Sequence, residues 1–250
     1  MAVDISDVTG LPDSKKREYY KFIKNRAPFS IEPIFVEPTY VYLQINAGIR
    51  YDINVTKIPS KTMETIIRNT ITNYRDENLN DFNVTFRNSK LAKYIDNAEI
   101  SIISSVLDIW LYKKSSLQPG VKQNLVLEYN TKLVDNIPKK NSIYPASDIH
   151  AFVSSTFRYN CKNCIFEDDG EGTVRLVATD GKTNQKIYDV GSIDYETGNV
   201  ILNNITVDTF LGSNVKFYVK PRDFDISTAK NTILTIEEDE IIIAIEQLRD

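Results

Sequence analysis

The stretch VYLQINAGIRYDINV at residues 41–55 carries an apolar side chain at every odd position. Those positions are Val41, Leu43, Ile45, Ala47, Ile49, Tyr51, Ile53 and Val55, and the intervening positions carry Tyr42, Gln44, Asn46, Gly48, Arg50, Asp52 and Asn54. A period of two residues indicates an extended strand, or two strands in one phase, with a single buried face. The sequence therefore predicts a long, two-faced sheet.

Elements that follow this stretch predict an α+β layer. Met63, Ile66, Ile67, Ile71 and Tyr74 recur at helical spacing and predict a helix that starts near Ser60. Residues 103–112 alternate again, with Leu107, Ile109 and Leu111 on one face and Val106, Trp110 and Tyr112 on the other. A turn at 118–120 leads to a further strand. We expect a mixed sheet with helices on one face, followed by a second, β-rich small domain.

Changes in composition divide the chain into three predicted parts. Residues 1–38 form an arm with a short helix and with prolines at 28, 33 and 38, residues 39–135 form the α+β domain, and residues 136–250 form the β-rich domain. Strand patterns in the last part fall at 149–159, 164–166, 173–179, 186–195, 199–202, 215–219, 233–236 and 240–245. The acidic run 237–240 between the last two predicts a solvated turn.

Composition disfavours nucleic acid and membrane as partners. The formal net charge is −4 and the basic residues are dispersed, whereas phosphate binding needs a concentrated basic stripe. No apolar run approaches the ~20 residues that cross a bilayer. The first residues lack the features of a signal peptide, so we expect a reducing interior in which the two cysteines stay unpaired. The sequons at Asn54, Asn83 and Asn204 are then chance matches.

Few residues could carry out chemistry. His150 is the single histidine, and its strand context is typical of a surface residue. Cys161 and Cys164 form a C-x-x-C, which could supply two zinc ligands, with His150 and Asp168 or Asp169 completing a site. The simpler interpretation places both cysteines at the end of a hairpin. The acidic segment 167–172 could attract Ca²⁺, but it lacks the ligand spacing of an EF-hand and favours a glycine-rich turn. We therefore predict no enzyme activity, cofactor or metal.

Aromatic side chains give the clearest functional indication. Tyr40, Tyr42, Trp110 and Tyr112 lie on the predicted sheet face opposite the aliphatic one. Tyrosine and tryptophan are favoured anchors of protein interfaces, so these four residues are the candidate subunit interface. Two alternatives stay open: burial by the arm or the β-rich domain of the same chain, and a platform for carbohydrate.

The segment IEPIFVEPTY at 31–40, before the long strand and the helix near Ser60, resembles the ring-forming baseplate wedge proteins of T4-like contractile-tailed phages, a baseplate J-like group. The likeness is to the C-terminal part of those proteins. IDYETGNV at 193–200, VKFYVKP at 215–221, DI at 225–226 and NTIL at 231–234 follow in the expected order. The likeness covers roughly residues 30–245. Members of the family are usually longer, which implies a C-terminal fragment or a shortened homologue.

The resemblance implies a structural subunit without catalytic residues. Such a subunit forms a homodimer and contacts other baseplate wedge proteins to build a ring around the central hub. We expect assembly in the host cytoplasm and a final location in the tail baseplate of the virion. The alternative functions are a carbohydrate-binding or adhesin module that uses the tyrosine-rich face, and a metalloprotein or enzyme built around His150, Cys161 and Cys164.

Overall fold

The computed structural model describes residues 12–26, 28, 32, 38–135, 150–179, 184–227 and 231–248. The chain divides into two compact units, Met1–Thr39 and Tyr40–Asp250. The predicted boundary between the α+β and β-rich domains lies outside the described residues, and that division stays a prediction. In the first unit, helix α1 spans Asp13–Lys24 and confirms the predicted short helix.

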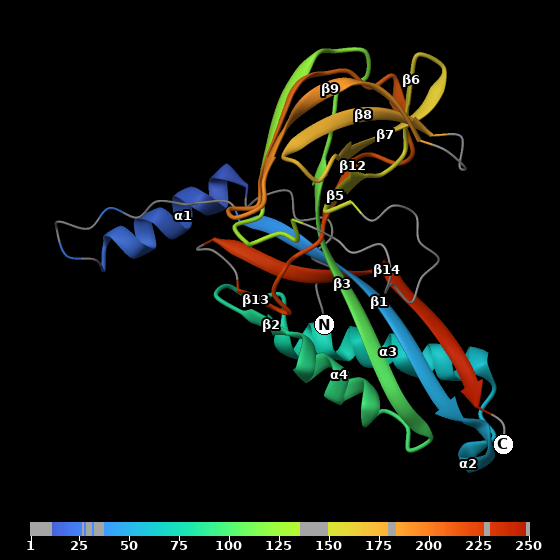
Figure 1. Ribbon diagram of the computed structural model, residues 1–250. Helices are drawn as coiled ribbons and strands as arrows, with labels where there is room; N and C mark the ends of the chain where they lie inside the picture. Colours follow the sequence, from blue (N-terminus) through green and yellow to red (C-terminus); the bar gives the residue numbers. More distant parts are fainter. Residues whose placement is uncertain are drawn as a thin grey trace. The chain divides into compact units, whose positions relative to one another are not determined.

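The second unit contains two sheets and three helices among the described residues (Figure 1). Its helices are α2 (Ile53–Thr56), α3 (Ser60–Asn78) and α4 (Asn88–Asp96). Its strands are β1 (Thr39–Asp52), β2 (Thr85–Arg87), β3 (Ile102–Ser115), β4 (Gln123–Glu128), β5 (Phe152–Ser154), β6 (Phe157–Tyr159), β7 (Lys162–Asp168), β8 (Thr173–Thr179), β9 (Asn184–Asp194), β10 (Asn199–Ile205), β11 (Thr209–Phe210), β12 (Val215–Val219), β13 (Asp225–Ser227) and β14 (Thr232–Leu248). The predicted α+β class is confirmed in this broad form, although strands dominate.

The large sheet runs in the order β14-β1-β3-β12-β5-β7-β8-β9-β10-β4, and β2 and β13 form a separate pair. Strand β3 joins the two regions of this sheet, because its first part pairs with β1 and its last part pairs with β12. Helix α3 packs against β14, and α4 packs against β3 (Figure 1). The β-rich region is therefore continuous with the helix-covered region through one hydrogen-bonded path of strands.

The alternation in β1 arises because its odd-numbered side chains face the core. Leu43, Ile45 and Ala47 are completely buried, and their partners on β3 lie on the same face. The pattern ends at Asp52 instead of Val55, since the Asp52 side chain accepts a hydrogen bond from the Asn54 backbone N–H and starts the short helix α2. Val55 is accordingly exposed.

Strand β14 corrects the prediction for the C-terminal segment. Residues 237–240 do not form a turn; they lie within one continuous strand whose neighbour in the sheet is β1. The acidic side chains tolerate this position because partners on other strands satisfy them. Glu237 accepts from Lys114 and Tyr112, and Glu240 accepts from Lys216, among others.

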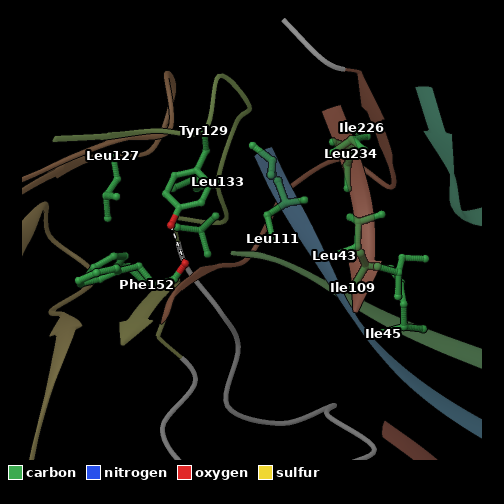
Figure 2. Close-up of a cluster of buried hydrophobic side chains, with 14 of the residues drawn as sticks. Leu43, Ile45, Ile109, Leu111, Leu127, Tyr129, Leu133, Phe152, Ile226 and Leu234 are labelled. Carbon is green, nitrogen blue, oxygen red and sulfur yellow. Dashed lines mark hydrogen bonds between the residues drawn. The ribbon is translucent and has the colours of Figure 1, made fainter. Parts of the chain in front are cut away.

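Buried side chains from both regions of the sheet form one continuous cluster. Figure 2 shows Tyr129 and Leu133 between Leu127 and Phe152 on one side and Leu111 on the other. The Tyr129 hydroxyl donates to the Phe217 carbonyl at 2.6 Å, so this buried polar group is satisfied. The shared core fixes the helix-covered layer against the β-rich region.

Candidate functional site

Four tyrosines form a row of rings across three adjacent strands. Tyr42 of β1 lies opposite Tyr112 of β3, and Tyr112 lies opposite Tyr218 of β12. Ring centroids are 6.2 Å apart between Tyr40 and Tyr42, 5.0 Å between Tyr42 and Tyr112, and 5.2 Å between Tyr112 and Tyr218. These separations are typical of attractive aromatic pairs. We call the sheet surface that carries these rings and Trp110 the ring face.

The four residues predicted to form an interface differ in burial. Tyr112 is completely buried, because Tyr42 and Tyr218 flank it and its hydroxyl donates to Glu237 at 2.6 Å. Tyr40, Tyr42 and Trp110 are only partly buried. Tyr112 therefore supports the ring face from within, whereas the other three present surface to the exterior. Their role in an interface stays a prediction.

Lysine side chains from the same chain lie over three of the rings. Lys114 Nζ is 4.7 Å from the centroid of Tyr42, Lys216 Nζ is 5.5 Å from that of Tyr112, and Lys220 Nζ is 5.3 Å from that of Trp110. Each arrangement is a cation–π contact. Because ammonium groups lie over them, Tyr42, Tyr112 and Trp110 do not offer the bare aromatic platform that sugar stacking uses.

Carboxylates of β14 hold the lysines and tyrosine hydroxyls in place. Glu240 accepts from Lys216 at 2.6 Å, from Tyr218 at 3.0 Å and from Gln44 at 2.6 Å. Burial lowers the pKa of Lys216, but the hydrogen bonds to Glu240 and Asp239 outweigh this effect and raise the pKa above its ordinary value. Burial, followed by the charge of Glu240, also raises the pKa of Tyr218. Lys216 is thus charged and Tyr218 neutral at pH 7.

Asp108 holds the Trp110 end of the ring face. Its carboxylate pairs with Lys220 and accepts from Trp110 Nε1 at 3.1 Å and from Asn46 Nδ2 at 3.3 Å. Burial lowers the pKa of Lys220 to about 8, whereas the ion pair favours its ammonium form. Lys220 is therefore mainly protonated at neutral pH. The Lys220 ammonium and the Asp108 carboxylate then both hold the indole of Trp110 in place.

Sequence reasoning missed the contributions of β12 and β14 to the ring face. The alternation in VKFYVK at 215–220 places Lys216, Tyr218 and Lys220 on one side of a strand, and this signal could have identified them. Nothing in the sequence indicates that Glu237 and Glu240 reach the same surface, because their position depends on long-range pairing. The complete ring face is a surface whose tyrosine, lysine and carboxylate groups are hydrogen-bonded to one another.

A second polar cluster surrounds His150. Its Nε2 lies 3.2 Å from the Glu167 carboxylate, and its Nδ1 lies 3.9 Å from that of Asp168. Both carboxylates are almost fully buried, which the sequence did not indicate. Arg175 pairs with Glu167 at 3.1 Å, and Tyr195 donates to Asp168 at 2.8 Å. These contacts satisfy the carboxylates and join the start of β5 to β7, β8 and β9.

The C-x-x-C motif forms the end of a hairpin, as the simpler interpretation predicted. Tyr159 of β6 pairs with Lys162 of β7, so Asn160 and Cys161 form a two-residue loop. Their φ angles are 48° and 63°, the left-handed values of a type I′ turn. Cys161 is exposed, whereas Cys164 is buried and burial raises the pKa of its thiol.

Of the residues proposed as metal ligands, His150 and Asp168 lie near each other, with His150 Nδ1 3.9 Å from the carboxylate. Within the described ranges, no group of three or more His, Cys, Asp or Glu side chains could hold a metal ion. The acidic segment 167–172 forms the predicted glycine-rich turn only in part, since Glu167 and Asp168 belong to β7. Asp169 Oδ1 accepts from the backbone N–H groups of Glu171 at 2.8 Å and Thr173 at 3.0 Å, which closes the turn.

Helices in the described part of the chain are too short or too polar to cross a bilayer.

Two comparisons relate the chain to known proteins. Residues 39–114, from the start of β1 to the residue before the end of β3, match the family model of baseplate structural protein gp6, C-terminal domain III. The chain is also similar to baseplate wedge protein gp6 of Enterobacteria phage T4, with 21% identity over 278 aligned residues. That alignment covers 90% of this chain and spans 39% of the length of the phage T4 protein.

The comparisons confirm the resemblance to phage baseplate wedge proteins. They agree with a viral structural protein and with a location in the tail baseplate. Neither favours a carbohydrate-binding module. The matched range 39–114 contains Tyr40, Tyr42, Trp110 and Tyr112, all four of the predicted interface residues.

Proposed function

We propose that this chain, as a relative of the baseplate wedge proteins, is a structural subunit of a phage tail baseplate wedge. It acts by contact and not by catalysis: it pairs with a second copy of itself and also binds other wedge proteins, so that the copies form a ring around the hub. A closed assembly of this kind needs at least two contact surfaces on each subunit. Its place is the tail baseplate of the virion.

The observation that carries this proposal is the position of the ring face within the family match. The match to domain III of baseplate structural protein gp6 covers β1 and β3, the two strands that hold Tyr42 and Trp110. Both side chains are partly exposed although neighbouring residues fix their orientation. Rigid, partly exposed aromatic side chains lose little conformational entropy on binding and are favoured anchors of interfaces.

Sedimentation velocity over a range of concentrations tests the proposal. The purified chain is expected to form a dimer that buries at least about 1,000 Å² in total. Trp110→Ala and Tyr42→Ala should each weaken binding to a second copy or to a candidate wedge protein more than they lower the free energy of unfolding. Phe224→Ala is the matched control, because Phe224 is an exposed aromatic residue in the loop between β12 and β13.

Two results would count against this function. The first is a chain that stays monomeric at high micromolar concentration and binds none of the wedge proteins mixed with it. The second is a loss of thermal stability without any loss of binding in Trp110→Ala and Tyr42→Ala, which would assign both rings to the core of this chain.

A further inference from the structure

Lys220 and Asp108 meet where the two regions of the large sheet join. Asp108 lies on β3, and Lys220 directly follows β12, the strand that pairs with the last part of β3. The two side chains form an ion pair in which the Lys220 ammonium contacts Asp108 Oδ1. The Lys220 side chain is 21% exposed and that of Asp108 is 35% exposed, so both groups are largely removed from water.

Two donors converge on the other oxygen of the same carboxylate. Trp110 Nε1 donates to Asp108 Oδ2 at 3.1 Å, and Asn46 Nδ2 donates to it at 3.3 Å. N–H groups that point at one oxygen stabilise the negative charge that develops there when a nucleophile attacks the adjoining carbon. The Asp108 carboxylate therefore has an amine against one oxygen and two oxyanion donors on the other.

The surroundings of this pair match those of a secondary amide. Lys220 Nζ donates to the Ile109 carbonyl at 3.1 Å, and an amide N–H in its place would keep this acceptor. Asp108 Oδ2 would become the amide oxygen, whose two lone pairs accept from Trp110 and Asn46. Both polar atoms of an amide at this position would thus have hydrogen-bond partners.

We propose that Lys220 and Asp108 condense into an intramolecular amide bond that crosslinks β3 to the end of β12. The ammonium first passes a proton to Asp108 Oδ1, which leaves a neutral amine beside a neutral carboxyl group. The lone pair of Lys220 Nζ then attacks Asp108 Cγ, and Oδ2 takes the electron pair of the carbonyl bond. When that bond forms again, Oδ1 leaves as water, with its own proton and one from Nζ. An Nζ–Cγ bond has formed, a Cγ–Oδ1 bond has broken, and ammonium plus carboxylate have become an amide plus one water molecule.

Burial favours the neutral pair from which this reaction starts. It lowers the pKa of Lys220 to about 8, so a fraction of these amines is uncharged near neutral pH. Lys216 on β12 provides the contrast, because it also pairs with a carboxylate, that of Glu240. Burial lowers the pKa of Lys216, but hydrogen bonds to Glu240 and Asp239 outweigh this effect and raise it. Lys216 therefore stays an ammonium and should not react.

Mass spectrometry of the purified full chain tests the crosslink. We expect the wild-type chain to be lighter by one water molecule than Lys220→Arg, after allowance for the substitution. A digest of the wild type should contain one branched peptide in which Lys220 is joined to Asp108. Lys220→Arg keeps a cation beside Asp108 but lacks the primary amine, so it should show its full mass. Lys216→Arg is the matched control and should retain the crosslink.

Three results would overturn the crosslink. The first is a folded wild-type chain that keeps its full mass. The second is a loss of water that persists in Lys220→Arg, which would assign it to a cyclic imide at an aspartate before a glycine, such as Asp169. The third is an equal loss of the branched peptide in Lys216→Arg. None of these results bears on the proposed function, since self-association and binding of wedge proteins are measured separately by sedimentation.

Discussion

Replacement of Glu240 by glutamine tests the most unexpected feature of the fold, the burial of acidic residues within β14. The Glu240 side chain is 9% exposed and accepts from Lys216, Tyr218 and Gln44. Glutamine keeps the shape but removes the negative charge and one of the two acceptor oxygens. Lys216 keeps Asp239 as a partner, and the Tyr218 hydroxyl loses its charged acceptor.

The expected cost follows from these contacts. A hydrogen bond to a charged group contributes about 1.5–3 kcal/mol, and loss of one partner of a fully buried pair costs about 3–5 kcal/mol. Because Lys216 is 23% exposed and retains Asp239, the cost should fall below the second range. We expect Glu240→Gln to lower the free energy of unfolding by about 2–3 kcal/mol.

Urea unfolding at pH 7, followed by circular dichroism, measures this difference. Glu238→Gln is the control, since it makes the same chemical change two residues away at an exposed position of the same strand. It should change stability by no more than about 0.5 kcal/mol. Equal effects of the two variants would refute the reasoning and would mean that residues 237–240 are solvated, as the sequence alone suggested.

Three further predictions concern single positions. Gly191→Ala should destabilise the chain by at least about 3 kcal/mol or prevent folding, because the added Cβ would lie 1.8 Å from the Ile201 carbonyl oxygen. Thermal melts compare it with Gly170→Ala, whose Cβ meets open space and whose φ of 82° should cost only about 1–2 kcal/mol. Cys161→Gly should raise the free energy of unfolding by about 0.5–1 kcal/mol, since glycine adopts the φ of 63° freely and Asn-Gly is the favoured type I′ pair. An unchanged or lower midpoint of urea unfolding would contradict this prediction. Above pH 10 the unfolded chain releases the Tyr218 proton before the folded chain does, because folding raises the pKa of this hydroxyl. The free energy of unfolding should therefore fall by up to about 1.4 kcal/mol per pH unit for this residue. Tyr218→Phe should show a shallower alkaline decline, and an equal decline would refute the assignment.

The sequence predicted the elements whose burial follows a local period. The odd positions of β1, the apolar stripe of α3 and the strands β8 and β12 were evident because each buries one face against the core. The position of β14 could not be derived in this way. Its pairing with β1 joins segments almost two hundred residues apart, as the Gln44–Glu240 contact illustrates, and no local pattern encodes such a partner.

For the candidate site, the sequence predicted which side chains share a face of the sheet but not which of them are buried. Alternation placed Tyr42 and Trp110 on one face, but it could not show that Tyr112 is buried there by Tyr218 and Glu237. The burial of two carboxylates beside His150 was missed for a similar reason. Charged residues enter a core only when partners satisfy them, and those partners come from other strands.

Hydrogen exchange at low and high protein concentration tests the central claim, that this chain acts by contact with other subunits, most directly. We expect amide protection of peptides that contain Tyr42 and Trp110 to rise with concentration, while peptides of α3 exchange equally at both concentrations. Addition of a wedge protein that binds the ring face should protect peptides around Trp110. Exchange that is independent of concentration and of every added wedge protein would contradict the account.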